Sequence, residues 1–159
     1  MLISEEHRSE EYKKHITDPD YGGESVEYAE YISRAINQTG VEEVLDYGAG
    51  KGELPKNMTL DHRVAVHLYD PAIPAIAEIP EPRQMVTCID VLNHVEDDCI
   101  EAVMDDLKRV TKSLIFIVIT EDHRDMEWWL PKIMERFSVQ SLIRSSVDFY
   151  VIAEAKNEH

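Results

Sequence analysis

Apolar residues recur along this chain with two different periods, which together predict alternating strands and helices. Short apolar runs, which are typical of buried parallel strands, lie at 41–45, 63–69, 85–90 and 114–119. Helices are predicted over 25–38, 53–60 and 96–112, and the last of these begins with acids and ends with bases, as the helix dipole favours. This order predicts an α/β fold built on a doubly wound, mainly parallel sheet.

The C-terminal part of the chain predicts a helix and then a pair of strands. The helix is expected to begin at Trp128 and to pack through Leu130, Ile133, Met134 and Phe137. Two short strands at 138–144 and 149–155 are joined by turn residues and predict an antiparallel hairpin. Upstream, the stretch 71–82 holds four of the seven prolines, so a regular helix is not expected there.

The segment 44–52 joins the first strand to a glycine-rich turn. Gly48, Gly50 and Gly52 allow the backbone to turn sharply and to approach a ligand with no Cβ in the way. The carboxyl ends of parallel strands are where open α/β sheets bind ligands. Asp46 ends the first strand, and Asp70 ends the second, 18 residues beyond Gly52. An acid in that place can accept hydrogen bonds from ribose hydroxyls, although a simple turn aspartate before a proline is the alternative.

Composition restricts the partners of the chain. Its 159 residues predict a single domain, 1–159, in which the polar segment 1–24 forms an arm or a flap. The net charge of −16 disfavours nucleic acid and favours a small molecule or a basic protein surface. No stretch approaches the ~20 apolar residues of a membrane span, and no secretory signal is visible. The two cysteines form neither a disulfide framework nor a metal set, which fits a cytoplasmic location.

Two motifs have the order and spacing of a known family. Residues 46–52 read Asp-Tyr-Gly-Ala-Gly-Lys-Gly, and residues 90–94 read Asp-Val-Leu-Asn-His. Together with the acid at position 70 and the terminal hairpin, they resemble class I S-adenosylmethionine (SAM) dependent methyltransferases over 25–155, in particular compact proteins of bacteria and their phages. The family commonly has Glu where this chain has Asn93. The resemblance implies a Rossmann-like sheet, here reduced at the third-strand edge because 71–82 is too short for the usual helix and strand.

The resemblance also implies which residues form the site. Cofactor contacts are expected from Asp46, Tyr47, Gly48, Ala49, Gly50, Gly52, Asp70, Pro71, Ile89, Asp90, Val91 and, on the N-terminal flap, Tyr21. Because the third strand is missing, Ile73 and Ile76 are candidates for an apolar wall beside the adenine. No metal ligands are expected.

Candidate groups for the acceptor lie after the third and fourth apolar strands. His123 and His94 are the candidate general bases, and Trp128 and Trp129 are candidates for a platform that holds a flat or cationic acceptor. Each has a structural alternative. His94 could hold its loop to the next helix, His123 could be an exposed loop residue, and the tryptophans could be one core and one surface residue.

The sequence therefore predicts a SAM-dependent methyltransferase whose unidentified acceptor is a small molecule. One alternative is an acidic SAM-binding protein without transfer activity that engages a protein partner, and another is an enzyme that degrades SAM. A nicotinamide dehydrogenase is disfavoured because position 53, where the dinucleotide motif places its third glycine, is Glu. The sequence does not determine whether the protein forms a homo-oligomer.

Overall fold

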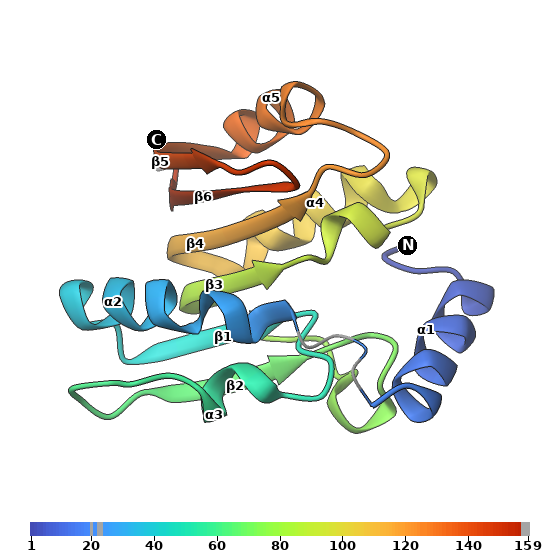
Figure 1. The fold of residues 1–159 in the computed structure, drawn as a ribbon, viewed down its shortest axis with the longest axis horizontal. Coiled ribbons are helices and arrows are strands. Elements are labelled where there is room, and N and C mark those ends of the chain that lie inside the picture. The colour runs from blue at the N-terminus through green and yellow to red at the C-terminus, as the bar shows by residue number, and fades with distance from the viewer. Residues whose placement is uncertain (20, 22–23, 157–159) are drawn as a thin grey trace.

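A single six-stranded sheet forms the centre of the protein. The computed structural model describes residues 1–19, 21 and 24–156 (Figure 1). The strands are β1 (Glu43–Tyr47), β2 (Ala65–Tyr69), β3 (Arg83–Ile89), β4 (Thr111–Thr120), β5 (Phe137–Arg144) and β6 (Asp148–Ala155). Their order in the sheet is β2-β1-β3-β4-β6-β5. β2, β1, β3 and β4 run parallel, whereas β6 pairs antiparallel with both β4 and β5.

This topology confirms the predicted fold class, including its reduced edge. β2 is the last strand on its side of the sheet. The proline-rich stretch that follows it forms only a 3₁₀ turn at Pro74–Ile76 before the chain returns to β3. The antiparallel pair β5 and β6 closes the opposite side, as the C-terminal pattern predicts.

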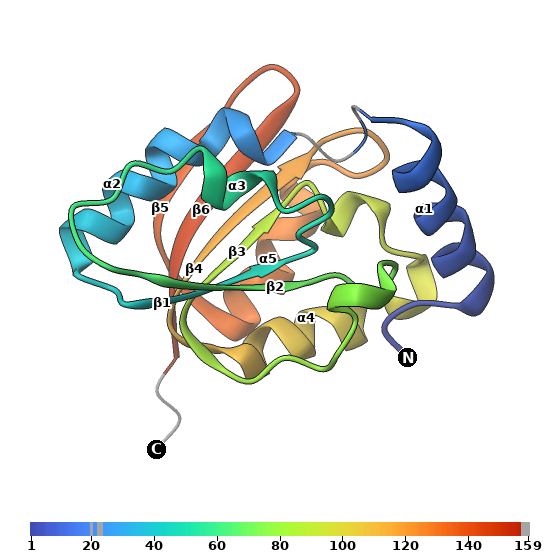
Figure 2. The ribbon, with the colours of Figure 1, turned by 90° about the horizontal axis from the view of Figure 1, so that it is seen from below.

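Helices cover both faces of the sheet. α2 (Ala29–Thr39) and the short α3 (Glu53–Lys56) lie on one face, and α4 (Ile100–Val110) and α5 (Met126–Arg136) lie on the other (Figure 2). Each face has its own apolar core, with Ile32 and Ile36 of α2 buried on the first and Val103 and Leu107 of α4 on the second. Among the described residues, no helix is long and apolar enough to cross a membrane.

Several helix boundaries differ from the predicted ones. The segment 25–38 starts as a 3₁₀ turn through Tyr28 and becomes α-helical at Ala29. The helix predicted over 53–60 is only one turn long. α5 begins two residues before Trp128, because the Asp125 carboxylate accepts a hydrogen bond from the Trp128 N–H at 3.0 Å and caps the helix. Met134 is 50% exposed, so its predicted place on the inner face is wrong.

The polar N-terminal arm is largely a helix, α1 (Glu5–Thr17), which the sequence analysis missed. Ser4 caps it by accepting a hydrogen bond from the His7 N–H at 3.1 Å. α1 has no buried residue and therefore no apolar stripe from which it could be predicted. It stands beyond the carboxyl ends of the parallel strands, away from both helical layers (Figures 1 and 2).

Candidate functional site

A cavity of about 250 Å³ lies between the carboxyl ends of the parallel strands and α1. Most of the predicted cofactor residues line it, in agreement with the rule that open α/β sheets bind ligands at this edge. The predicted residues on its wall are Tyr21, Asp46, Tyr47, Gly48, Gly50, Asp70, Pro71, Ile89, Asp90, Val91 and His94. Four separate stretches of the chain thus meet at one place.

The glycine turn after β1 needs glycine at position 48 for two reasons. Gly48 has a φ of +83°, which side-chain-bearing residues rarely adopt. A Cβ at this position would also lie 2.3 Å from the Cγ2 atom of Val91. The backbone N–H groups of Gly48 and Ala49 both donate to the carbonyl of Tyr69, at 2.7 and 2.9 Å. The turn is therefore held tightly between the ends of β2 and β3.

Asp46 carries a buried carboxylate with one oxygen unused. The residue is 2% exposed, and its Oδ1 accepts a hydrogen bond from the Thr87 hydroxyl at 2.9 Å, whereas Oδ2 has no partner. Burial raises the pKa of Asp46 to about 7, and the nearby charge of Asp70 adds to the rise. Because Asp46 lines the cavity, its Oδ2 is available to a cationic or hydrogen-bond-donating ligand group.

Asp70 is fixed at the end of β2 by two backbone groups. Its Oδ2 accepts from the Gly50 N–H at 3.1 Å, and its Oδ1 accepts from the Ala72 N–H at 3.0 Å. Burial raises the pKa of Asp70, and these two hydrogen bonds oppose the rise. Each carboxylate oxygen keeps a second lone pair. The side chain can therefore accept hydroxyl donors while it holds the glycine turn, and its ribose role stays a prediction.

Asp90 follows β3 in a left-handed conformation and pairs with His94. Its φ is +56°, unusual for a residue with a side chain, and its Oδ1 accepts from the Thr120 hydroxyl at 2.6 Å. Its Oδ2 lies 3.6 Å from the Nε2 atom of His94. Burial opposes the charged form of Asp90, but the contact with His94 and the hydrogen bond from Thr120 outweigh it and lower the pKa. In turn, the Asp90 carboxylate raises the pKa of His94.

Asn93 stands in this segment where the family pattern has Glu. Its side chain lines the cavity, and its Oδ1 is buried without a hydrogen-bond partner. The segment therefore carries an unpartnered carbonyl acceptor on a residue that lines the cavity, where the family's Glu would carry a charge.

The wall that the sequence analysis missed is one face of α1. His7, Glu11 and His15 follow one another at intervals of four residues and line the cavity. They are the half-buried residues of α1, and its other residues are exposed. The Tyr21 hydroxyl donates a hydrogen bond to Glu11, which ties the segment after α1 to the same face. The four-residue spacing of titratable side chains was the available signal, but it required knowing that this segment is helical.

Four predicted site residues near the glycine turn or the crossover lie outside the cavity wall. Ala49 and Gly52 do not line the cavity, and they serve the turn itself. Ile73 and Ile76 are also absent from its wall, so the apolar surface that they were expected to supply comes instead from Leu2, Ile3, Ala72 and Val95.

The candidate acceptor residues after β4 also lie outside the cavity. Trp129 is 1% exposed and belongs to the core on the α4 and α5 face. Trp128 packs between the Arg124 guanidinium and the Lys132 amine, 4.2 and 4.9 Å from its ring centre. His123 is exposed, and only its neighbour Asp122 reaches the cavity. The two tryptophans are thus one core and one surface residue, and they form no platform at the cavity.

The fold is a Rossmann-like domain, and its cavity is lined by a glycine turn and by the strand-end carboxylates of Asp46, Asp70 and Asp90. A family model, described as a methyltransferase domain, matches residues 22–146, so the chain belongs to the methyltransferase domain family. No protein of curated function matches the chain in sequence.

Solved structures share the fold at low sequence identity. A 1,6-didemethyltoxoflavin-N1-methyltransferase of Burkholderia thailandensis, described with bound 1,6-didemethyltoxoflavin and S-adenosylhomocysteine (SAH), is 16% identical, with a TM-score of 0.72 over 94% of this chain and 87% of that one. The magnesium protoporphyrin IX methyltransferase of Synechocystis PCC 6803 with bound SAM is 14% identical, with a TM-score of 0.65 over 92% and 90%. A SAM-dependent methyltransferase of Aquifex aeolicus is 16% identical, with a TM-score of 0.59 over 93% and 98%.

SAM is the cofactor of this family, and the residues at the cavity fit its functional groups. The unpartnered Oδ2 of Asp46 suits the cationic part of SAM, which carries an ammonium group. The free lone pairs of Asp70 suit hydroxyl donors, and the missing Cβ of Gly48 keeps the turn close to Val91. Among the described residues, no group of three or more His, Cys, Asp or Glu side chains could hold a metal ion.

Proposed function

We propose that this SAM-dependent methyltransferase acts on a small molecule, which enters the cavity beneath α1. The observation that carries this proposal is a single cavity that joins the glycine turn and Asp46 to the pair Asp90–His94. α1 covers this cavity, which leaves room for a small acceptor rather than for a surface or a duplex. The net charge of −16 also disfavours nucleic acid. The Burkholderia and Synechocystis structures, whose names refer to small-molecule acceptors, support the same class.

The residues of the chain have separable tasks in this reaction. SAM, when bound, supplies a methyl group whose bond to sulfur breaks as the acceptor bonds to the methyl carbon, and the electron pair stays on sulfur. The glycine turn and Asp46 bind one end of the cofactor, and Asp70 binds hydroxyl groups. His94, oriented by Asp90, accepts a proton from the acceptor. Holding the reacting atoms in line is the main contribution of such a site.

Calorimetry with SAM, SAH and NAD tests the cofactor assignment. We expect SAM and SAH to bind and NAD not to bind. Asp70→Ala is expected to weaken SAM binding by about 1–3 kcal/mol, because a charged hydrogen-bond acceptor is lost. Asp98→Ala is the matched control, since it removes an exposed carboxylate outside the cavity. Unchanged SAM affinity in the Asp70 variant would refute the ribose assignment.

Mass spectrometry of SAM incubated with the protein tests the reaction itself. With an acceptor panel present, we expect labelled methyl groups to appear on an acceptor and SAH to accumulate. SAM breakdown without any acceptor would instead indicate the degrading enzyme. Cofactor binding without any labelled product would indicate the binding protein, and either outcome would overturn the proposal.

A further inference from the structure

The wall of the cavity carries a strongly negative set of side chains. Among the described residues, six carboxylates line it, together with three histidines and no lysine or arginine. The carboxylates are Glu11, Asp46, Asp70, Asp90, Glu96 and Asp122. Asp46 and Asp70 adjoin the glycine turn, and the other four carboxylates come from α1 and from the segments after β3 and β4. Charges that are partly buried in a cavity act more strongly than charges on an open surface.

Glu11 of α1 is the acid that faces both halves of the cavity. Its side chain is 12% exposed. After the larger effect of Asp90, Glu11 is among the charges that raise the pKa of His94, and after burial it adds to the rise in the pKa of Asp70. Glu11 therefore lies within electrostatic reach of both strand ends.

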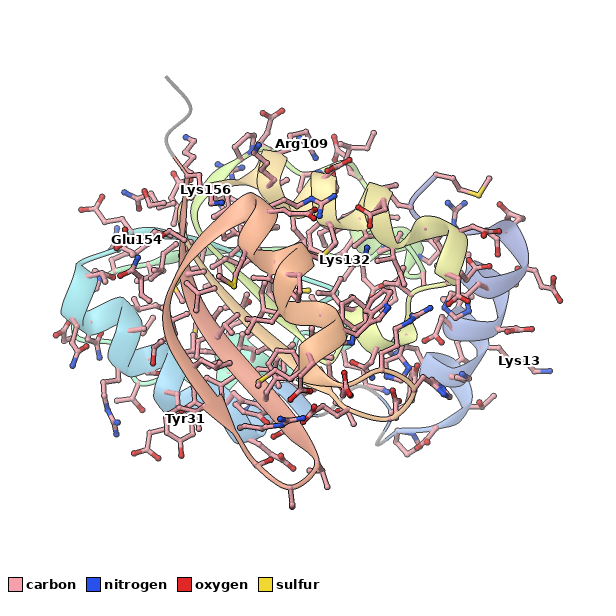
Figure 3. The ribbon with its side chains drawn as sticks, turned by 90° about the horizontal axis from the view of Figure 1, so that it is seen from above. Lys13, Tyr31, Arg109, Lys132, Glu154 and Lys156 are labelled. Carbon is pink, nitrogen blue, oxygen red and sulfur yellow. The ribbon has the colours of Figure 1, made fainter. Side chains whose placement is uncertain are left out.

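The other contacts of Glu11 leave it charged and able to accept more hydrogen bonds. The Tyr21 hydroxyl donates to one oxygen, and the Lys14 amine and the His7 Nε2 atom lie 3.3 and 3.8 Å from the other. Lys14 is 53% exposed on the solvent side, where water screens its charge. Although burial alone would raise the pKa of Glu11, these contacts lower it below its usual value. Lys13, the neighbouring cation of α1, points away from the sheet (Figure 3).

Asn93 adds a second acceptor on the sheet side of the cavity. Its Oδ1 is buried and has no partner, so a ligand that donates a hydrogen bond there removes the cost of an unsatisfied carbonyl. Glu11 and Asn93 come from different elements, α1 and the segment after β3. The Glu11 carboxylate only accepts hydrogen bonds, and the Asn93 carbonyl is an acceptor without a partner, so a ligand with N–H donors satisfies both.

Building on the proposed function, we propose that the methyl acceptor is an amine, recognised by the Glu11 carboxylate and the Asn93 carbonyl. Methylation of an amine moves positive charge from sulfur to nitrogen, and a negative cavity stabilises that charge at its new position. A carboxylate or phenolate acceptor would instead be repelled by the same wall before it could react.

The proton and electron balance assigns a task to His94. An ammonium ion has no free electron pair, so one proton passes to the His94 imidazole and then to solvent. The nitrogen pair then forms the bond to the methyl carbon, while the carbon–sulfur bond breaks and its pair remains on sulfur. The products are the methylated ammonium ion and SAH, and the proton released balances the charge.

Calorimetry on the full chain saturated with SAH tests this substrate class. Two sets of probes share a carbon skeleton and differ in one functional group: phenethylamine, phenethyl alcohol and phenylacetate, and butylamine, butanol and butyrate. We expect an amine to bind about tenfold more tightly than its alcohol, which corresponds to one charged hydrogen bond. Glu11→Gln is expected to remove this preference, whereas Glu10→Gln, which neutralises an exposed acid of the same helix, is expected to retain it.

Each outcome of this experiment decides the proposal. Tighter binding of an alcohol or a carboxylate, equal binding of all probes, or the same loss in both glutamine variants would overturn the amine assignment. Transfer of tritiated methyl groups from SAM to nitrogen would support it, and transfer only to oxygen, carbon or sulfur would overturn it while leaving the methyltransferase proposal standing. Failure to bind SAM or SAH would refute the proposed function itself.

Discussion

Asp46→Asn is expected to make the protein more stable and a weaker binder of SAM. Asn keeps the Oδ1 atom that accepts from the Thr87 hydroxyl, and it replaces only the unpartnered Oδ2. The substitution therefore removes a buried negative charge with little change in shape. A charge that burial disfavours in the free protein becomes useful when a cationic ligand group arrives.

The size of the effect follows from the pKa of Asp46, which rises from 3.8 to about 7 on folding. Between these values the folded protein holds a proton that the unfolded chain has lost, so stability falls as pH rises, by about 1.4 kcal/mol per pH unit. The total is roughly 4 kcal/mol, reached near pH 7. The variant lacks this loss. Near pH 4 its free energy of unfolding is expected to equal that of the parent, and at neutral pH it is expected to be higher by roughly 4 kcal/mol.

Urea denaturation from about pH 4 to about pH 8 measures this difference. Asp98→Asn, the same change at an exposed site, is the control and is expected to show a flat difference. Calorimetry at neutral pH is expected to show SAM binding weakened by about 1.5–3 kcal/mol in the Asp46 variant. If the free energy of unfolding of the Asp46 variant depended on pH as that of the parent does, or were lower at neutral pH, the conclusion that Asp46 carries a destabilising buried charge would be refuted.

The remaining predictions concern the glycine turn and the candidate bases. Gly48→Ala is expected to lower the free energy of unfolding by about 1–3 kcal/mol, because the new Cβ meets Val91 at a positive φ. Adding Val91→Ala to this variant should recover only part of the lost free energy of unfolding, because the positive φ remains. If Gly48→Ala alone were as stable as the parent in denaturation, the close approach of Gly48 and Val91 would be contradicted. His94→Asn is expected to lower kcat about a hundredfold, whereas His123→Asn, outside the cavity, should change it little. Equal losses in steady-state kinetics would show that the cavity does not contain the reacting atoms.

The sheet and the cofactor end of the site could be predicted because their signals are local. Buried parallel strands are continuous apolar runs, and a turn such as that at Gly48 tolerates only glycine. Asp46, Asp70 and Asp90 each end a strand, so topology alone brings them to one edge. That inference needed only the order of strands and helices along the chain. It did not need the register in which the strands pair.

The acceptor side could not be predicted because its signals depend on tertiary structure. α1 buries no apolar side chain, so its helical character rests on the Ser4 cap and on charged pairs such as Glu11–Lys14. Neighbouring residues of one helix point about 100° apart, which puts Trp129 in the core and Trp128 at the surface. The sequence places both tryptophans in the segment after β4, but it does not determine which side chain faces the core and which faces solvent.

α1 lines the cavity while adding nothing to either apolar core. The side chains at positions 7, 11 and 15 therefore belong to neither apolar core, in contrast to that of Leu107. A descendant of this domain could exchange the side chains of that helix, and with them its choice of molecule, without endangering the scaffold. The sheet and its two cores maintain the fold, whereas α1 can change the cavity wall, so the same small fold can accommodate different substrates.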